Sequence, residues 1–553
     1  MIWRLDGRLS FEVLDRDLLG RIGRLRTKRG FVETPLLLPV VNPSIQLISP
    51  EELKRDFGCE ALITNAYLLK KNFETEVKAK GVHDFLGFDR VIMTDSGAYQ
   101  ILVYGGVDVS AEAIAQFEED IDVDVAVILD VPTGWNNRRE KAEETVSETL
   151  RRARLTLGSL KRSDILWVGP VQGGNYLDLV AKSASEVGRM PFQIHALGSP
   201  TQVMERYLFS TLVDMIVAAK RNLPAERPFH LFGAGHPFML ALAVALGCDI
   251  FDSAAYALYA KEGKYMTEYG TARLRNMSYF PCSCGVCSRH TPAEVLKMEP
   301  WERTRLLAWH NLSSCFTEIR RIKQAIREGR LWELLEVRCR SHPSLFQALK
   351  GLRRYGEFVE AGSLVSKERG LFYYDSVGLA RPEVVYYRRI LGGWVPPDVY
   401  DVLLLLPQST SKPFHGSKEY RRVMKLLEEA LGERLERVHV CVYAAPFGVI
   451  PTELDEVYPL SQFEAALPLD GETVEYVGEQ VEAYLLSQKG RYGSVVLHYD
   501  VDELGRRVVA ACEKGCRMVG ARFLPSLAEE KTWGKAALEN LVKVVSGEMK
   551  AED

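Results

Sequence analysis

Three cysteines and one histidine in this chain have the residue types and the spacing of a metal site. Cys282, Cys284 and Cys287 lie within six consecutive residues, and His310 follows on a segment that is expected to be helical. Three thiolates and one imidazole form the ligand set of a closed tetrahedral zinc site. Such a site leaves no position for a substrate, so we expect one structural Zn²⁺ per chain and the reaction chemistry to lie elsewhere.

A second group of polar residues indicates where that chemistry takes place. Seven short apolar segments in the first 255 residues are followed by a polar side chain or a glycine that suits a ligand site. One aspartate in such a position is explained as well by capping of the next helix. Three aspartates and one glutamine, mixed with glycines that let a ligand approach the backbone, make capping a weak explanation for the whole set. The residues are Asn65, Asp95, Asp130, Gln172, Gly198, Gly233 and Asp252.

The apolar segments themselves predict the fold. Eight of them are continuous rather than alternating, which is typical of parallel strands buried on both faces, and helical patterns separate them. This order favours a (β/α)₈ TIM-type barrel, in which the active site lies at the C-terminal ends of the strands. An open doubly wound sheet is the alternative, but no Gly-x-Gly-x-x-Gly follows the first segment. The segments are 34–41, 61–64, 91–94, 125–129, 165–171, 192–196, 229–232 and 249–251.

The composition is that of an ordinary globular protein. Of the 553 residues, 47% are hydrophobic and 26% are charged, and the net charge of −4 neither indicates nor excludes nucleic-acid binding. No apolar run approaches the roughly 20 residues of a membrane span, and the first residues lack the apolar core of a signal peptide. Thiolates that bind zinc are expected in a reducing compartment, so we expect a cytoplasmic protein without a membrane segment.

Seven motifs follow one another along the first 350 residues. They are Thr-Asp-Ser-Gly-Ala-Tyr-Gln (94–100), Leu-Asp-Val-Pro-Thr (129–133), Gly-Pro-Val-Gln-Gly-Gly (169–174), His-Ala-Leu-Gly-Ser-Pro (195–200), His-Leu-Phe-Gly-Ala-Gly-His-Pro (230–237), Phe-Asp-Ser-Ala-Ala-Tyr (251–256) and the cysteine cluster with His-Asn-Leu (310–312). With these motifs in this order, roughly residues 10–350 resemble the tRNA-guanine transglycosylases, specifically the archaeal type that begins archaeosine synthesis. The fifth and sixth motifs are similar to the archaeal branch.

This resemblance implies a pentosyltransferase that exchanges a guanine in the D-arm of tRNA (position 15) for the free base 7-cyano-7-deazaguanine (preQ0). The exchange would be the first tRNA-level step of archaeosine biosynthesis and would pass through a covalent enzyme–RNA intermediate. The resemblance assigns the nucleophile to Asp252 and the acid/base to Asp95, although the opposite assignment of the nucleophile stays open. Both carboxylates are expected to be essential.

The resemblance also implies which residues bind the base. Asp130 would accept hydrogen bonds from the N1–H and the amino group of guanine, and Tyr99 would stack on the ring. Gln172 and the backbone around Ala196, Leu197 and Gly198 would bind the C6 carbonyl. Phosphates of the tRNA are expected at Lys261 and Lys264 on an active-site loop, and at Arg320 and Arg321 on the helix that follows His310.

Three other functions remain as alternatives at this point. A queuosine-type transglycosylase would act in the anticodon loop instead of the D-arm. A non-catalytic tRNA-binding subunit would lack the nucleophile or the zinc ligands, yet both are present in this sequence. An unrelated small-molecule barrel enzyme, such as a decarboxylase, would not carry the ordered motifs.

The sequence predicts several domains. We expect the barrel at 1–275 and 311–350, a zinc-binding subdomain at 276–310, a connecting subdomain at 351–398, a smaller α/β domain at 399–530 that resembles the C2 domain of archaeal transglycosylases, and a helical tail at 531–553. No β-rich PUA domain is recognisable, so we expect either a separate PUA-domain protein as a partner beside tRNA or tRNA binding without that module. The family tends to dimerise through the zinc region, which predicts a homodimer. Cys512 and Cys516 are interpreted as structural or free.

Overall fold

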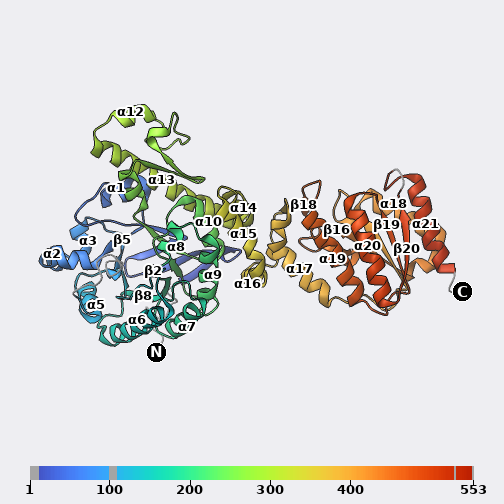
Figure 1. Ribbon diagram of the computed structural model, residues 1–553, viewed down its shortest axis with the longest axis horizontal. Helices are drawn as coiled ribbons and strands as arrows, with labels where there is room; N and C mark the ends of the chain where they lie inside the picture. Colours follow the sequence, from blue (N-terminus) through green and yellow to red (C-terminus); the bar gives the residue numbers. More distant parts are fainter. Residues whose placement is uncertain (1–10, 99–108, 529–530, 551–553) are drawn as a thin grey trace. The chain divides into compact units, whose positions relative to one another are not determined.

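The computed structural model describes residues 11–98, 109–528 and 531–550, and the chain divides into two units, 1–352 and 353–553 (Figure 1). The first unit contains the cysteine cluster and all of the strand-end residues singled out above. The second unit has a hydrophobic core of its own. The candidate functional site therefore belongs to the first unit.

Eight parallel strands form the centre of the first unit. They follow one another around the sheet in chain order, and β4 and β11 are paired directly. A bridge between Val40 and Ile63, with the Val41 amide donating to the Ile63 carbonyl at 2.8 Å, joins β4 to β5 and closes the barrel. The prediction of a (β/α)₈ barrel is confirmed. The strands are β4 (Leu36–Pro39), β5 (Ala61–Asn65), β6 (Val91–Asp95), β7 (Val125–Val127), β8 (Leu166–Val171), β9 (Ile194–Leu197), β10 (Phe229–Leu231) and β11 (Ile250–Ser253).

The barrel strands are apolar throughout because both of their faces are buried. In β5, Ala61 and Ile63 pack in the barrel interior, whereas Leu62 between them belongs to the cluster beneath the outer helices. Successive side chains of a strand point to opposite faces, so a strand with two buried faces needs an unbroken apolar run. This is the physical reason that the eight segments could be located from the sequence.

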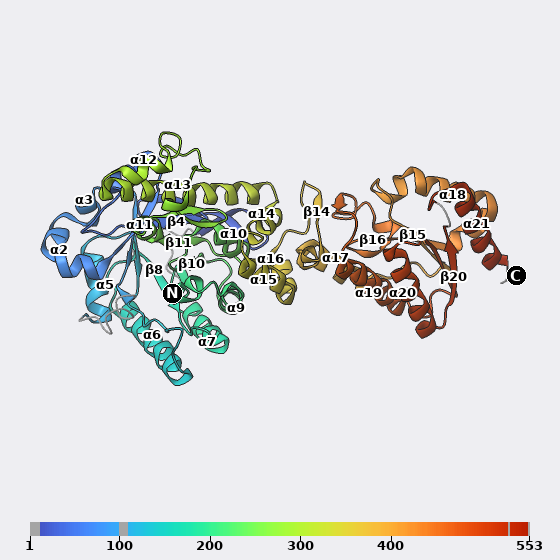
Figure 2. The same ribbon diagram turned by 45° about the horizontal axis from the view of Figure 1, so that its top comes forward.

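Helices connect the barrel strands on the outside. Figures 1 and 2 show α5, α6 and α7 side by side, in agreement with their contacts. The helical patterns that separate the apolar segments in the sequence include those of α5 and α6. The helices are α1 (Pro50–Phe57), α2 (Ala66–Lys80), α3 (Val82–Leu86), α5 (Ala111–Asp120), α6 (Arg139–Ser159), α7 (Leu177–Gly188), α8 (Thr201–Glu205), α9 (Phe209–Lys220) and α10 (Pro237–Ala245).

A small antiparallel sheet that the sequence did not indicate covers the N-terminal end of the barrel. It consists of β1 (Phe11–Asp17), β2 (Gly20–Thr27) and β3 (Gly30–Thr34). Phe11 and Leu25 pack with the residues of the barrel interior. Arg21 forms an ion pair with Asp249, the residue before β11, at 2.5 Å. Because this end is closed, the functional site is left to the C-terminal end.

The chain leaves the barrel after β11 and forms the region that carries the cysteine cluster. In the long helix α13, Ile319, Ile322 and Ile326 are buried at helical spacing, so one face of the helix packs against the rest of the unit. The elements are α11 (Ala255–Lys261), the hairpin β12 (Lys264–Thr267) and β13 (Gly270–Arg273), η1 (Leu274–Asn276), α12 (Pro292–Lys297), α13 (Pro300–Arg327), α14 (Leu331–Cys339) and α15 (Pro343–Gly351).

The second unit is an α/β fold around a sheet of order β17-β16-β15-β19-β20, in which only β17 is antiparallel. Figure 2 shows α18 and α21 on one side of this sheet and α19 and α20 on the other. Strand β20 was not expected from the sequence. The elements are η2 (Leu352–Tyr355), α16 (Gly356–Gly362), β14 (Leu371–Tyr373), η3 (Ser376–Ala380), α17 (Pro382–Gly393), β15 (Val402–Pro407), η4 (Phe414–Gly416), α18 (Lys418–Leu431), η5 (Gly432–Arg437), β16 (Val438–Ala444), β17 (Gly448–Pro451), η6 (Thr452–Leu454), β18 (Phe463–Ala465), α19 (Gly471–Ser487), β19 (Ser494–Tyr499), α20 (Glu503–Val519), β20 (Arg522–Leu527) and α21 (Lys535–Lys550).

Both ends of the second unit are integrated into it. Within the segment 351–398, β14 pairs in parallel with β18, which lies about ninety residues further along the chain. Leu541 and Val545 of α21 are buried in the core of the unit. Cys512 and Cys516 are unbridged thiols buried on α20, as interpreted from the sequence.

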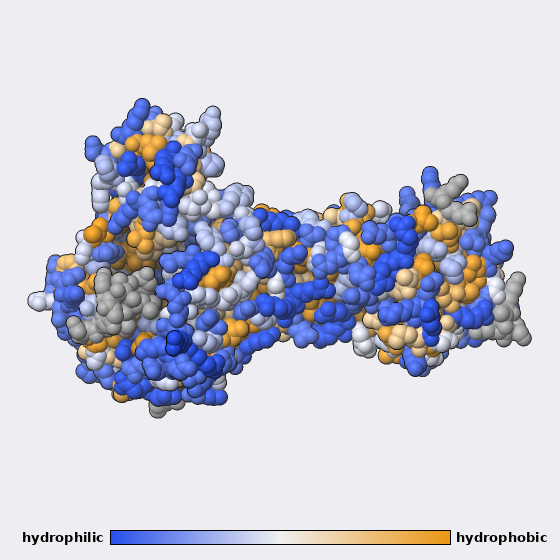
Figure 3. Space-filling view, viewed as in Figure 1, coloured by the Kyte–Doolittle hydropathy of each residue, from blue (hydrophilic) through white to orange (hydrophobic). Residues whose placement is uncertain are grey.

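No helix in the described part of the chain combines the length and the apolar character needed to cross a bilayer. The face shown in Figure 3 is mostly hydrophilic, with only separate hydrophobic patches.

Candidate functional site

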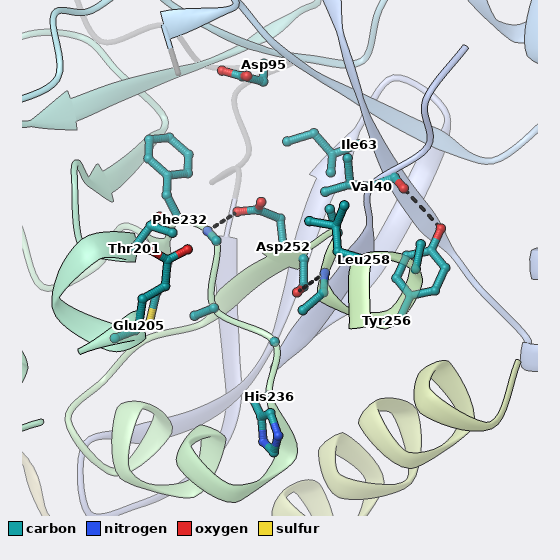
Figure 4. A pocket seen from close by; sticks show the side chains of 18 of the residues that line it. Val40, Ile63, Asp95, Thr201, Glu205, Phe232, His236, Asp252, Tyr256 and Leu258 are labelled. Carbon is teal, nitrogen blue, oxygen red and sulfur yellow. Dashed lines mark hydrogen bonds between the residues drawn. The ribbon is translucent and has the colours of Figure 1, made fainter. Parts of the chain in front are cut away.

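A cavity of about 850 Å³ opens at the C-terminal ends of the barrel strands (Figure 4). The strand-end residues singled out in the sequence line it together, although they come from different strands or the loops that follow them. This clustering excludes helix capping as their only role. The lining includes Asn65, Asp95, Asp130, Gln172, Gly198, Gly233 and Asp252.

Asp252 on β11 is held by one of its two carboxylate oxygens. The Gly233 amide donates to Oδ1 at 2.9 Å, and His230 Nε2 donates to the same atom at 2.9 Å. The other oxygen, Oδ2, forms no hydrogen bond among the described residues, and Figure 4 shows it on the side of the cavity where Asp95 lies. Two donors on one oxygen fix the orientation of the carboxylate and therefore of its other oxygen.

His230 is a functional residue to which the sequence assigned no role. It is fully buried on β10, and its Nδ1 atom has no hydrogen-bond partner among the described residues. Its contact with a carboxylate oxygen places the proton on Nε2, because that atom must donate. A polar residue inside an otherwise apolar strand was the available signal. The contact with Asp252 depends on the neighbouring strand, which no local pattern reveals.

Asp95 at the end of β6 has an unusually high pKa for an aspartate. Burial, followed by the charges of Asp130 and Asp252, raises its pKa to about 7. Asn65 Nδ2 donates to Asp95 Oδ2 at 3.0 Å and opposes this rise. A carboxyl group with a pKa near neutrality can both donate and accept a proton at physiological pH, which suits general acid and base catalysis.

Asp130 and Gln172 form a buried pair. Gln172 Nε2 donates to Asp130 Oδ2 at 2.5 Å, while its Oε1 accepts from the Thr133 amide at 2.9 Å and from the Ser199 hydroxyl at 3.0 Å. The backbone amide of Thr133 can only donate, so it fixes which end of the Gln172 side chain carries the nitrogen. Burial raises the pKa of Asp130 to about 6. The pair presents fixed acceptors and donors to a ligand in the cavity.

The backbone next to this pair is only partly available to a ligand. Ala196 and Leu197 are fully buried in β9 and are not among the cavity-lining residues, whereas Gly198 is. The Gly198 amide already donates to the Val171 carbonyl at 2.8 Å. A Cβ atom at position 198 would lie 2.2 Å from Gln172 Nε2. Glycine is therefore required here because the Gln172 amide packs directly against its backbone.

The walls of the cavity include an aromatic ring that the sequence did not single out. Phe232, in the loop after β10, lines the cavity and contacts the His230 ring edge-on at 4.6 Å between centroids. Figure 4 shows its ring on the side of Asp95. Tyr99, the predicted stacking residue, lies outside the described residues. A flat ligand between Asp95 and Asp252 would contact the Phe232 ring.

The four basic residues predicted to bind phosphates differ in their surroundings. Lys261 and Lys264 line the cavity, and Lys264 forms an ion pair with Glu262 at 2.5 Å. Arg320 and Arg321 are exposed on α13 and are not among the lining residues. Arg321 pairs with Glu268 at 3.2 Å, and Arg320 donates to the Thr317 hydroxyl at 3.1 Å. Of these four residues, only the two lysines lie beside the cavity.

The four predicted metal ligands come together in the structure. The sulfur atoms of Cys282, Cys284 and Cys287 and one nitrogen of His310 all lie within 4.8 Å of one another. His310 Nδ1 is 3.5 Å from the Cys284 sulfur and 3.4 Å from that of Cys287. Zn–S and Zn–N bonds of about 2.3 and 2.0 Å at a tetrahedral angle place S and N about 3.5 Å apart. The donor set and its spacing therefore fit one metal ion.

The surroundings of His310 prepare it for this role. Its Nε2 donates to the Met266 carbonyl at 2.9 Å, which leaves Nδ1 for the metal. The Tyr265 ring stacks on the imidazole at 3.6 Å. The next residue, Asn311, accepts from the Met266 amide at 2.8 Å and donates to the Tyr256 carbonyl at 3.2 Å. The helix that carries His310 is thus bonded to the segment that follows Asp252.

Comparison with known proteins identifies the barrel unit. A family model described as queuine tRNA-ribosyltransferase matches residues 16–344, more than half of the chain. The chain belongs to the queuine tRNA-ribosyltransferase family. The resemblance to tRNA-guanine transglycosylases predicted from the motifs is therefore confirmed, and the chain is an enzyme of the transferase class.

Relatives of this chain match it beyond the barrel. It is 43% identical to the tRNA-guanine(15) transglycosylase of Aeropyrum pernix over 499 residues, which cover 88% of this chain and 94% of the relative. It is 44% identical to the protein of that name from Methanosarcina mazei, over 83% of this chain and 87% of the relative. It is 42% identical to the Methanococcus aeolicus protein of that name, over 82% of this chain and 68% of the relative. Residues 384–545 match a domain of unknown function (DUF5591).

Proposed function

We propose that this protein exchanges guanine at position 15, in the D-arm of tRNA, for free 7-cyano-7-deazaguanine, the first tRNA-level step of archaeosine biosynthesis. The observation that carries the proposal is the placement of Asp95, Asp130 and Asp252 in one cavity with different electrostatic surroundings. The names of the relatives supply the position of the exchanged guanine.

In the first half of the reaction, Asp252 is the nucleophile. Its Oδ2 attacks C1′ of the target ribose, the bond from C1′ to guanine N9 breaks, and an enzyme–RNA ester forms. The departing guanine receives a proton from Asp95. The division of roles follows from the surroundings, because two donors hold Oδ1 of Asp252 and leave Oδ2 to attack, whereas Asp95 is partly protonated at neutral pH.

In the second half, the free base enters and Asp95, now a carboxylate, accepts the proton from its N9. That nitrogen attacks C1′, and Asp252 leaves as a carboxylate that His230 and Gly233 stabilise. The proton count closes over the cycle, because Asp95 regains the proton that it gave to guanine. Esterification removes the charge of Asp252, so the pKa of Asp95 is expected to fall in the intermediate, which keeps Asp95 in the carboxylate form that can accept a proton.

The buried pair of Asp130 and Gln172 is proposed to recognise the base. Guanine and 7-deazaguanines share an edge with a carbonyl, an N1–H and an amino group. Asp130 can accept from the latter two, while the second N–H of Gln172 Nε2 could donate to the carbonyl. Tyr99 and Phe232 would stack on the ring, and Gly198 would lie beside it, with Ala196 and Leu197 buried behind Gly198 in β9. Adenine, with an amino group in place of the carbonyl, would leave these groups mispaired.

The tRNA must present its target base outside the stack to reach this cavity, and Lys261 and Lys264 are proposed to contact the adjoining phosphates. The metal is proposed to be Zn²⁺ in a structural role, because three thiolates and an imidazole complete its tetrahedral preference. A homodimer formed through the zinc region and a separate PUA-domain partner stay predictions.

A direct test measures release of labelled base from defined tRNA. The chain is incubated with preQ0 and a tRNA transcript labelled in the guanine at position 15, and with a matched transcript labelled in the anticodon loop. We expect release from the first and none above background from the second. Release from the anticodon-loop transcript would support a queuosine-type enzyme instead, and release from neither would contradict the proposal.

The acidity of Asp95 predicts a pH dependence. Because the protonated form must donate to guanine, kcat/KM for tRNA should fall as the pH rises above about 7, approaching tenfold per pH unit. Asn65→Ser removes the amide that stabilises the Asp95 carboxylate and keeps an oxygen to cap α2 at the Leu68 amide. The alkaline limb should move to higher pH in this variant. A profile that is flat from about pH 6 to 9, or a limb that Asn65→Ser moves downward, would contradict the role of Asp95.

A further inference from the structure

The lining of the cavity extends beyond Asp252 to a group of aromatic residues around His236. Figure 4 shows Asp252 between Asp95 on one side and His236 on the other, and all three line the same cavity. On the His236 side the walls are aromatic. Ring contacts link Tyr207 to Phe238 at 6.1 Å, Phe238 to His236 at 4.4 Å, and His236 to Tyr259 at 6.1 Å. We call these four residues the aromatic lobe.

Tyr207 is held in this lobe against its own conformational preference. Its backbone φ is +57°, a left-handed conformation that a tyrosine rarely adopts. One side of its ring stacks on His342 at 4.8 Å with an angle of 21° between the planes, and the edges contact Phe209 and Phe238. The residue is nevertheless 44% exposed and lines the cavity. Its neighbours therefore fix a flat ring at the cavity surface instead of burying it.

The opposite side of the lobe combines an aromatic ring with positive charge. Tyr259 on α11 is half-buried, and Lys264 Nζ lies 4.8 Å from its ring centre. Lys264 is partly neutralised by Glu262, but Lys261 on the same helix as Tyr259 is exposed at the rim. Aromatic rings beside lysines are the combination that binds single-stranded nucleic acid, by stacking on bases and attracting phosphates.

The proposed reaction determines what must occupy the lobe. If the target base lies with Asp130 and Gln172, its C1′ lies at Asp252, and the ribose and the adjoining nucleotides must continue away from that pair. We propose that the aromatic lobe binds a nucleotide adjacent to the exchanged guanine, with its base stacked on Tyr207. This inference rests on the proposed function for the identity of the ligand as RNA.

The test compares Tyr207→Ala with Tyr207→Phe, which keeps the ring. We expect Tyr207→Ala to weaken binding of the tRNA transcript by about tenfold or more, in line with the stacking of one base. Tyr207→Phe should bind like the wild type. Binding of free guanine, measured by competition, should be unchanged in both variants, because the base lies on the other side of Asp252.

Abasic transcripts identify the stacked nucleotide. Transcripts that lack the base on the 5′ or the 3′ side of guanine 15 are bound to the wild type and to Tyr207→Ala. One of them should bind the wild type about tenfold less tightly than the unmodified transcript does, and its affinity should not fall further in Tyr207→Ala. If both bind the wild type normally, or if the two losses add, Tyr207 does not stack on a neighbouring base.

Two further outcomes are distinguishable. Loss of guanine binding in Tyr207→Ala would show that this variant disturbs the whole cavity. Tyr207→Leu, which keeps the bulk without a flat ring, is then the deciding variant. It must lose tRNA binding and keep guanine binding, or the inference fails. If the wild type binds tRNA through Tyr207 but releases no guanine from it, the proposed function fails and the binding lobe stands.

Discussion

Asp252→Asn is expected to lower base exchange by at least about three orders of magnitude while the chain still binds free guanine. An amide oxygen is too weak a nucleophile to form the ester with C1′. The amide oxygen of the substituted side chain can still accept from Gly233 and His230, so the geometry of the site should persist. Exchange of labelled guanine into tRNA, and guanine binding by competition, measure the two quantities.

The same experiment separates the two assignments of the nucleophile. Wild-type protein incubated with tRNA and no free base should accumulate an RNA–protein adduct that survives denaturation, and Asp252→Asn should form none. Asp95→Asn is the matched control, because it also removes one carboxylate from the same cavity. It should lose turnover, and any adduct that it forms slowly should map to Asp252. An adduct mapped to Asp95 in the wild type would overturn the assignment.

The location of this site was predictable from the sequence because two local signals coincide. The strand pattern has a strict physical cause, since residues such as Leu62 and Ile63 are buried on opposite faces of one strand. The polar residues after the strands, such as Asp95 and Asp252, then fall at the same end of the barrel. Neither step requires knowledge of contacts that are distant in the chain.

The electrostatic roles were not predictable in the same way. The pKa of Asp95 depends on its burial and on Asp130 and Asp252, which belong to other parts of the barrel. His230 acts on Asp252 only because β10 lies beside β11. The use of the Gly198 amide by Val171 likewise follows from the pairing of β9 with β8. Motif residues can be recognised from short stretches of sequence. Their protonation, and which of their hydrogen-bonding groups are free, depend on contacts between strands that form only in the folded barrel.

The elements that the sequence missed are those with weak local patterns. In β1 only the first and last residues are fully buried, so it shows no clear apolar run. In β20 only Ser526 is fully buried, and it is a polar residue. Such strands are held by contacts with neighbouring elements rather than by their hydrophobic content. Arg21 of β2, the strand that pairs with β1, forms an ion pair with Asp249, and β20 pairs with β19.

The cysteine cluster should contribute to both stability and catalysis. Elemental analysis should find one zinc per chain in the wild type. Cys282→Ala should contain much less, because the three remaining ligands hold Zn²⁺ poorly. The melting temperature should fall, because metal binding contributes folding free energy directly. Cys315→Ala is the matched control: it removes a buried thiol from α13, the helix that carries His310, but leaves the four ligands intact. It should retain the zinc and lose little stability.

The effect of Cys282→Ala should reach the active site through α13. His310 and Asn311 bond the backbone of β12, and Asn311 also bonds the Tyr256 carbonyl in α11, four residues after Asp252. Loss of the metal frees this end of α13, so limited proteolysis should cut first between residues 276 and 300. Exchange should fall, mainly through a higher KM for tRNA, because Lys261 and Tyr259 lie on α11 beside the cavity. A metal-free Cys282→Ala protein with unchanged melting, proteolysis and KM would show that the cluster is dispensable.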